Sequence, residues 1–407
     1  MRPELILITL AKSIRSFAFT ALAVSVPFFL ISLNIGTIDI TLVILVSLAV
    51  STGFLYMFTN LRLHSRQKLI LLSSLFFAAL LILYIREDLV ALIAAIFIGS
   101  ISLGGRDLTV NQSIEQFTIS TYTENQKEKN IMFGLYNFGS YAAGAIAAGF
   151  LFLISSSDFP LIFLDILILS AIQVLIYLYV QFPEVVRNRQ KETLSDRTVR
   201  RNISNLAVLF SVDSIGGGLV NTAVISLWFK VVYNISLSQA GLIFVLVNVI
   251  TALSVLLSSH ISGRIGLVKT MVYTHLISNV FLFAVPLFHN LLISEIFLYL
   301  RQSTSQMDVP ARDSFVNSFI PRDARVAGNS TFLAVRNGGQ VPGPGIAGII
   351  LSVFPAGVFF TASLTKIAYD IAFFLGYRKY KISETTCQER NARQRLIMLT
   401  LPSREAP

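Results

Sequence analysis

Charged side chains inside otherwise apolar stretches are the residues of this sequence best placed to do chemistry. The acidic ones are Asp165, Asp213, Asp308 and Asp370, with Glu115 near the end of another stretch, and the basic ones are Arg15, Arg301, Arg336 and Lys366. A charge at the centre of a bilayer costs about 2.5–3.5 kcal/mol on insertion scales, so each should face a water-filled path or a partner. The two signs balance when Glu115 is set aside, so the sign of the charge on a bound solute does not follow from them.

One group of polar residues is spaced to share a helix face. Arg301, Ser305, Asp308 and Arg312 follow one another at intervals of four, three and four residues, which places them in one stripe along a helix. We expect this stripe to line an aqueous path. On one interpretation it serves gating or coupling there, and on the other it is a salt-bridge network that locks two halves of the protein together.

Two closer spacings indicate partners for other charges. Asp107, Asn111 and Glu115, at successive intervals of four residues, give the first half of the chain a counterpart to the stripe at 301–312, and the two stripes are expected to meet across a pore. Lys366 and Asp370 are also four residues apart. Because helical side chains at this spacing meet, we expect these two to form an ion pair within one helix.

Asp213 has the most suggestive surroundings of the acidic residues. It lies in the middle of an apolar run, in the segment SVDSIGGG at 211–218, where the glycines favour a bent or broken helix. Backbone groups freed at such a break can bind a solute or an ion, and a carboxylate there can take up and release a proton. The alternative is a permanent ion pair with Arg15 or Arg336. His275, a lone histidine in a later apolar run, is assigned no role.

The elements that must position these residues are membrane spans. Of the 407 residues, 54% are hydrophobic and only 13% are charged, whereas soluble proteins carry about 25% charged residues. This composition excludes an ordinary soluble protein. Twelve apolar runs are long enough to cross a bilayer, and they lie at 8–33, 39–59, 68–86, 89–112, 131–153, 159–182, 204–229, 238–261, 268–288, 291–310, 326–352 and 356–377.

The distribution of Lys and Arg predicts the topology. The loops after even-numbered runs and the C-terminal tail are rich in these residues and the N-terminus holds Arg2, whereas the other loops hold only Arg86 and Lys230, and positive loops stay cytoplasmic. We therefore expect a multi-pass protein of the cell membrane with both termini in the cytoplasm. The expected parts are a six-helix bundle at 1–182, a basic linker at 183–203, a second six-helix bundle at 204–378 and a basic tail at 379–407.

The same composition limits the expected partners. The basic residues form no soluble patch, so a nucleic-acid partner is not expected, although the linker at 183–203 can touch anionic lipid headgroups. Cys387 is the single cysteine and cannot form an intrachain disulfide, and the four histidines show no metal-ligand spacing. We expect a monomer without a metal or cofactor, with a small-molecule substrate, protons and membrane lipids as its partners.

Two short basic turns resemble a loop of a known family. The segment GRIGLVK at 263–269 is similar to the loop between the second and third helices in each half of major facilitator superfamily proteins. NLRLHSRQK at 60–68 keeps the basic residues without the usual acidic residue and glycine. In that family the loop is a cytoplasmic latch between conformations. The resemblance assigns this latch to Arg62, Arg66, Lys68, Arg264, Gly266 and Lys269.

Two further segments resemble the same superfamily. PRDARVAG at 321–328 is similar to the start of its eleventh helix, and SQMDVPAR at 305–312, together with MVYTH at 271–275, resembles a poorly characterised prokaryotic branch. The resemblance covers residues 8–377. It implies an all-α integral membrane protein with twelve transmembrane helices in two pseudo-symmetric six-helix bundles, and it implies no substrate.

Together these features predict a secondary active transporter that moves a small solute by alternating access and is coupled to a proton gradient. The alternative is a non-transporting membrane receptor or scaffold, and export of drugs or metabolites and import of nutrients are both open. An enzyme is not expected, because the sequence contains neither a phosphate-binding Gly-x-x-x-x-Gly-Lys loop nor a His-Glu-x-x-His motif. The candidate substrate or proton-coupling residues are Arg15, Glu115, Asp165, Asp213, Arg301, Asp308, Arg312 and Arg336.

Overall fold

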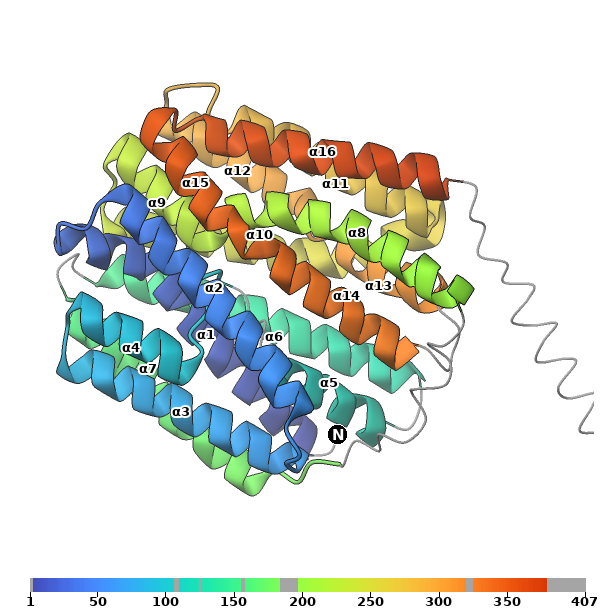
Figure 1. Ribbon diagram of the computed structural model, residues 1–407, viewed down its shortest axis with the longest axis horizontal. Helices are drawn as coiled ribbons and strands as arrows, with labels where there is room; N and C mark the ends of the chain where they lie inside the picture. The colour runs from blue at the N-terminus through green and yellow to red at the C-terminus, as the bar shows by residue number, and fades with distance from the viewer. Residues whose placement is uncertain are drawn as a thin grey trace, which may run out of the picture.

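The computed structural model describes residues 3–105, 110–123, 126–154, 158–183, 197–319 and 325–378. Most of the expected linker at 183–203 and all of the tail at 379–407 lie outside these residues. Regular secondary structure within them is helical (Figure 1). The N-terminal helices are α1 (Pro3–Ser32), α2 (Thr37–Asn60), α3 (Ser65–Ile85), α4 (Leu89–Gly99), α5 (Val110–Tyr122), α6 (Gln126–Leu153) and α7 (Phe159–Tyr179). The C-terminal helices are α8 (Arg197–Leu219), α9 (Thr222–Tyr233), α10 (Leu237–Ile265), α11 (Leu267–Ala284), α12 (Leu291–Ser305), α13 (Asp308–Phe319), α14 (Arg325–Gln340), α15 (Pro342–Val353) and α16 (Gly357–Tyr377).

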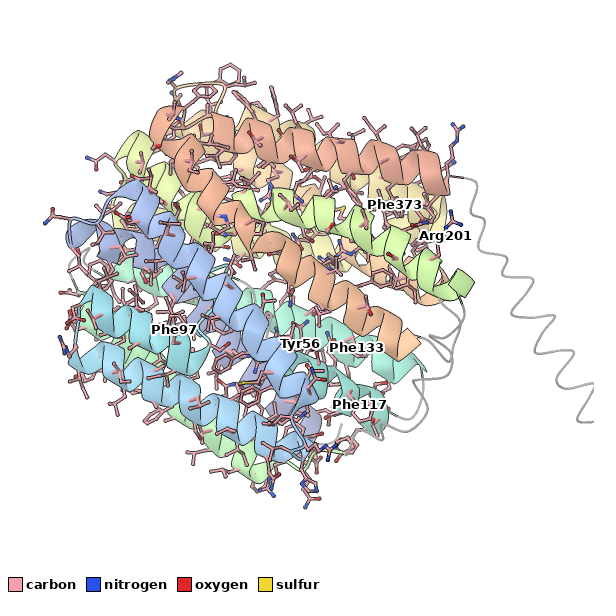
Figure 2. All side chains as sticks on the ribbon, in the orientation of Figure 1. Tyr56, Phe97, Phe117, Phe133, Arg201 and Phe373 are labelled. Atoms are coloured by element: carbon pink, nitrogen blue, oxygen red, sulfur yellow. The ribbon has the colours of Figure 1, made fainter. Side chains whose placement is uncertain are left out.

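The outer surface of the helices is apolar. Eight described segments are long and apolar enough to cross a membrane, namely α1, α2, α3, α7, α10, α11, α16 and the joined pair of α8 and α9. Tyr56 of α2 is 75% exposed and Phe97 of α4 is 55% exposed, whereas Phe373 of α16 is buried (Figure 2). Exposed Leu, Ile, Val and Phe side chains recur on most helices, as expected where lipid rather than water is the solvent.

Four of the expected spans are divided. The run at 89–112 forms α4 and α5, the run at 204–229 forms α8 and α9, the run at 291–310 forms α12 and the start of α13, and the run at 326–352 forms α14 and α15. Apolar composition predicts the length of a span but not its continuity, and so the sequence did not show most of these interruptions.

Local residue chemistry explains the interruptions. Ser100, the residue after α4, has a φ angle of 53°, a left-handed value that ends the helix, and Gly105 has a φ angle of 74° in the segment between α4 and α5. Asn221 caps α9, because its Oδ1 accepts a backbone N–H of the first turn at 3.0 Å. Pro310 and Pro342 lie in the first turns of α13 and α15, where the missing N–H has no partner within the helix to lose. Pro310 was expected to kink or end its span, and the break lies just before it.

The helices pack as two groups that meet mainly along three helix pairs. Helices α1–α7 pack largely against one another, as do α8–α16, and the groups meet where α6 lies along α10, α2 along α15 and α1 along α9 (Figure 1). A Cβ at Gly241 of α10 would lie 2.5 Å from Phe152 N and 2.7 Å from Ala148 O of α6, and a Cβ at Gly348 of α15 would overlap Thr41 Oγ1 of α2. These glycines let the backbones approach closely, and such packing holds helices together in lipid.

Buried apolar side chains distinguish the two ends of the molecule. One large cluster, the shared core, contains residues from both groups of helices, including Leu22 of α1 and Trp228 of α9. A second cluster, around Tyr136, takes its described buried residues from the N-terminal part of the chain, and a third, around Phe315, takes them from the C-terminal part. The two groups thus share a core at one end and have separate cores at the other, where α1 begins and α16 ends (Figure 1).

Candidate functional site

A polar cavity lies between the two groups of helices, with about 1170 Å³ of space when the part open to solvent is counted. The interruptions in the helices line it, with Gly104 and Gly105 before α5, Asn221 before α9 and Gln306 before α13. A Cβ at Gly105 would overlap the side chain of Thr222, so the first two interruptions lie in contact. Backbone groups released at such breaks can bind whatever the cavity holds.

Asp213 belongs to a network of buried charges at this cavity. Its Oδ1, on α8, lies 2.6 Å from Lys366 Nζ of α16 and 3.4 Å from His275 Nε2 of α11. His275 Nδ1 lies 2.7 Å from Asp370 Oδ1, and Asn279 Nδ2 donates to Asp370 Oδ2 at 2.9 Å. Asp213, His275, Asn279 and Lys366 line the cavity, whereas Asp370 is only 1% exposed. The imidazole therefore bridges a carboxylate at the cavity and a carboxylate in the protein interior.

A glycine beside Asp213 makes room for its partner. The glycines at 216–218, expected to bend or break the helix, remain within α8, and the break comes at Asn221. A Cβ at Gly216 would lie 2.8 Å from Lys366 Cγ. Gly216 thus lets the lysine stem lie against α8, which brings its ammonium group to the carboxylate.

This network corrects one expectation and adds one residue. Lys366 and Asp370 were expected to pair within α16, but each contacts a partner on another helix, Asp213 for the lysine and His275 for the aspartate. The expectation was wrong because tertiary partners replace the neighbour on the same helix. His275 was missed, although Asn279, four residues later on the same face, was a signal of a polar site.

The polar stripe predicted at 301–312 lies along the same cavity. The cavity lining includes all four of its residues, Arg301, Ser305, Asp308 and Arg312, and also Arg336 of α14. Arg312 Nη1 donates to Asp308 Oδ2 at 2.6 Å, and Arg301 Nη1 donates to Gln302 Oε1 at 3.0 Å. The stripe faces the cavity even though the helix is interrupted between Ser305 and Asp308.

Arg15 and Glu115 form a separate buried ion pair within the N-terminal helices. Arg15 Nη1 and Nη2 donate to the two oxygens of Glu115 at 3.1 and 2.6 Å. The hydroxyls of Tyr136 and Tyr177 donate to the same carboxylate at 2.6 and 2.5 Å. Glu115 was expected to meet the stripe at 301–312 across a pore, together with Asn111 and with Asp107, which lies outside the described residues. That expectation was wrong, because α5 packs against α1 and α6 and the arginine of α1 reaches the carboxylate.

A second, smaller pocket of about 400 Å³ lies beside Arg15, within the N-terminal helices. Ser51 Oγ, Asn111 Oδ1 and Gln173 Oε1 belong to residues that line it, and they have no hydrogen-bond partner among the described residues. Buried oxygens of this kind normally bind water, so we expect the pocket to be hydrated. Asp165, a further sequence candidate, is half-buried on α7 and lines neither cavity.

The residues assigned to the latch lie in and beside the loops that precede α3 and α11: Arg62 and Gly266 are in the loops, Arg66 and Lys68 are in the first turn of α3, Arg264 is at the end of α10 and Lys269 is in the first turn of α11. Gly266 has a φ of 86° directly before α11, a conformation that favours glycine. Arg66 donates to the backbone oxygen of Leu178 at the end of α7. The side chain of Arg264 lies outside the described residues. Of the others, Arg62 and Lys269 are exposed and Lys68 is half-buried.

The described residues contain no group of three or more His, Cys, Asp or Glu side chains arranged to hold a metal.

Comparison with known proteins identifies the family of this chain. The model of the Major Facilitator Superfamily matches residues 8–300. The uncharacterized MFS-type transporter YceJ of Bacillus subtilis (strain 168) is 27% identical over 184 residues, which are 44% of this chain and 45% of that protein. The aligned part of the chain therefore spans less than half the length of this relative.

Solved transporter structures share the fold. The POT family transporter PepTSo superimposes with a TM-score of 0.75 at 11% identity, covering 94% of this chain and 99% of that one. The nucleoside transporter NupG superimposes with a TM-score of 0.67 at 14% identity, covering 93% of this chain and all of that one (100%). Identity at this level shows a common fold and nothing about the solute.

Proposed function

The chain belongs to the Major Facilitator Superfamily and is a multi-pass membrane transporter of a small molecule, and we propose that it is a secondary transporter that works by alternating access. In this mechanism two bundles rock about a central site, which opens to one side of the membrane at a time. The observation that carries the proposal is the unequal packing of the two ends, with a shared core at one and separate cores at the other. The polar cavity lies between the groups that would move.

The proposed architecture has twelve spans in two six-helix bundles. It follows when α4 and α5, α8 and α9, α12 and α13, and α14 and α15 are each counted as one interrupted span. The bundles occupy 1–182 and 204–378, the linker 183–203 joins them, and the tail is 379–407. With both termini cytoplasmic, as the Lys and Arg distribution predicts, the end with separate cores faces the cytoplasm.

A cysteine in the cavity tests alternating access without a known solute. Thr20 of α1 lines the cavity, so Thr20→Cys in a Cys387→Ser background reports which side of the membrane reaches it. In vesicles of known orientation, we expect a membrane-impermeant thiol reagent to label this cysteine quickly from the cytoplasmic side and more slowly from the outer side. Ser32→Cys, at the exposed end of α1, should label from the outer side alone and so checks the topology. Labelling of Thr20→Cys from a single side under every condition would favour a non-transporting receptor.

We also propose that the network around His275 couples transport to protons. Protonation of Asp213 would weaken its 2.6 Å ion pair with Lys366, which links α8 to α16 at the cavity. His275 is placed to exchange the proton with the interior carboxylate of Asp370. The groups that face His275 or share its network are Asp213 of α8, Asn279 of α11, and Lys366, Tyr369 and Asp370 of α16.

Asp213→Asn is expected to abolish the pH response of the transporter. The amide can still accept a hydrogen bond from Lys366, but it cannot take up a proton. In the Thr20→Cys background, the labelling rate should change several-fold between mildly acidic and mildly alkaline buffer, and it should become independent of pH in Asp213→Asn with the protein still folded and abundant. Asp39→Asn, at an exposed carboxylate of α2, is the matched control and should keep the response. An unchanged response in Asp213→Asn would exclude this carboxylate as the coupling group.

A further inference from the structure

We propose that the smaller pocket, within the N-terminal helices, binds a sodium ion through buried oxygens that have no other partner. Ser51 Oγ of α2, Asn111 Oδ1 of α5 and Gln173 Oε1 of α7 belong to residues that line this pocket, and they have no hydrogen-bond partner among the described residues. The three residues are only 2%, 4% and 1% exposed, so bulk water does not solvate them. Folded proteins leave few buried polar atoms unpaired, and several at one pocket indicate bound water or a bound ion.

The hydrogen bonds of Tyr177 determine which atom of the Gln173 amide is left without a partner. The Tyr177 hydroxyl donates its only proton to Glu115 Oε1 at 2.5 Å, so its oxygen is free to accept a proton from another group. It accepts from Gln173 Nε2 at 3.3 Å. The amide nitrogen of Gln173 is therefore turned toward Tyr177, and its oxygen is the atom that needs a hydrogen-bond donor or a cation.

The interruption between α4 and α5 adds backbone oxygens to the pocket. Helix α4 ends at Gly99, and Gly99 and the following Ser100 both line the pocket. The last four carbonyls of a helix have no partner within it, and they form the negative end of the helix dipole. Carbonyls at the ends of interrupted helices are typical ligands of Na⁺ in membrane transporters.

Neutral oxygens favour a monovalent cation. The described lining of the pocket contains no Asp or Glu, whereas Ca²⁺ and Mg²⁺ sites use carboxylates. Arg15 also lines the pocket, but its Nη1 and Nη2 donate to the two oxygens of Glu115 at 3.1 and 2.6 Å. Because the guanidinium is paired with a carboxylate, the two together add no net charge at the site. Water completes the ligand shell of the ion.

The ion is a resident of the N-terminal helices and is separate from the solute. No described residue lines both this pocket and the larger cavity. The three unpaired oxygens come from α2, α5 and α7, so an ion that binds all three holds these helices together beside the interruption after α4. This inference does not depend on alternating access, and the failure of either proposal leaves the other standing.

Thermal unfolding of the purified full-length protein in detergent tests the site. NaCl or KCl replaces choline chloride in steps, at constant ionic strength. A ligand that binds the folded state alone raises the unfolding temperature as its concentration increases. We expect Na⁺ to raise this temperature by a few degrees in a saturable way, and K⁺ to have little effect. Radiolabelled Na⁺ should bind the folded protein over the same concentration range.

Variants that remove one unpaired oxygen connect the stabilisation to this pocket. Ser51→Ala and Asn111→Leu should each weaken Na⁺ binding by about tenfold or more, the loss expected for one interaction with a charged group. Both should unfold in choline chloride at the parent temperature or above it, because an oxygen without a partner does not stabilise the fold. Ser25→Ala is the matched control. Ser25 is also buried, but its hydroxyl donates to Ala21 O at 2.7 Å, so this variant should keep the full response to Na⁺.

Asn111→Asp keeps an oxygen at the site and should retain the stabilisation by Na⁺; it and Ser51→Ala decide the result if Asn111→Leu does not fold. Equal unfolding temperatures in Na⁺, K⁺ and choline would show that the pocket holds water alone and would overturn the proposal. Equal stabilisation by K⁺ would contradict a sodium site. A full Na⁺ response in Ser51→Ala and in every folded Asn111 variant would place the ion elsewhere in the protein.

Discussion

Replacing Arg15 with leucine is expected to lower the free energy of unfolding by about 3–5 kcal/mol, because removing one partner of a buried ion pair leaves an uncompensated charge in the interior. Glu115 is 0% exposed. It would keep the hydrogen bonds from Tyr136 and Tyr177 but lose the guanidinium. Thermal and denaturant unfolding of the purified variant in detergent measures the loss.

An exposed ion pair of the same length provides the control. Arg86 and Asp88 also lie 2.6 Å apart, but their side chains are 67% and 40% exposed, and surface pairs contribute about 0–1 kcal/mol. Arg86→Leu should therefore unfold nearly like the parent. Combining Arg15→Leu with Glu115→Leu should recover part of the stability, because both buried charges are then gone. Equal losses for Arg15→Leu and Arg86→Leu would show that the Arg15–Glu115 pair does not stabilise the fold.

Gly241→Leu is expected to open the end of the molecule that has the shared core. The Cβ of any larger residue at 241 would meet the backbone of α6 at 2.5–2.9 Å, and backbone cannot move aside as a flexible side chain does. Overpacking of this kind costs about 1–3 kcal/mol, enough to shift a two-state equilibrium by about fivefold to a hundredfold. Labelling of Thr20→Cys from the outer side should rise by that factor, and labelling from the cytoplasmic side should fall.

Gly53→Leu separates this effect from a general effect of leucine in a helix. Gly53 lies inside α2, and a Cβ there would have no neighbour within 4 Å, so both labelling rates should match the parent. Gly241→Ala, which adds the Cβ alone, is the milder variant if Gly241→Leu does not reach the membrane. If Gly241→Leu and Gly241→Ala both label as Gly53→Leu does, the contact between α6 and α10 is not part of the gate.

Membrane spanning, transport and the superfamily could be predicted from local features of the chain. Apolar runs at 39–59 and 159–182 correspond to α2 (Thr37–Asn60) and α7 (Phe159–Tyr179), since lipid requires long apolar helices wherever they lie in the fold. Interruptions were harder to predict. The glycines at 216–218 drew attention to the right span, but they make room for a lysine from another helix, and the capping residue Asn221 marks the break.

Partners of the buried charges were not predictable from spacing. Lys366 has Asp370 one helical turn away, and yet its ammonium group lies at Asp213, 153 residues earlier in the chain. Arg15 and Glu115 were both candidates, but their pairing across 100 residues depends on α5 lying against α1. Desolvated charges take the partner that packing brings nearest, whatever its distance along the chain.

The number of buried charges could be read from the sequence, whereas their placement around the cavity could not. When Glu115 is set aside, the acidic and basic candidates within the apolar runs balance in number, and this count, which needs no fold, establishes only that buried ions must be accommodated. Folding sorts them into different places, since Asp370 is enclosed behind His275 and Arg15 pairs within the N-terminal helices, whereas Arg301, Arg312 and Arg336 line the cavity. Which buried charges line the cavity is therefore a property of the assembled helices, because it depends on contacts between segments far apart in the chain.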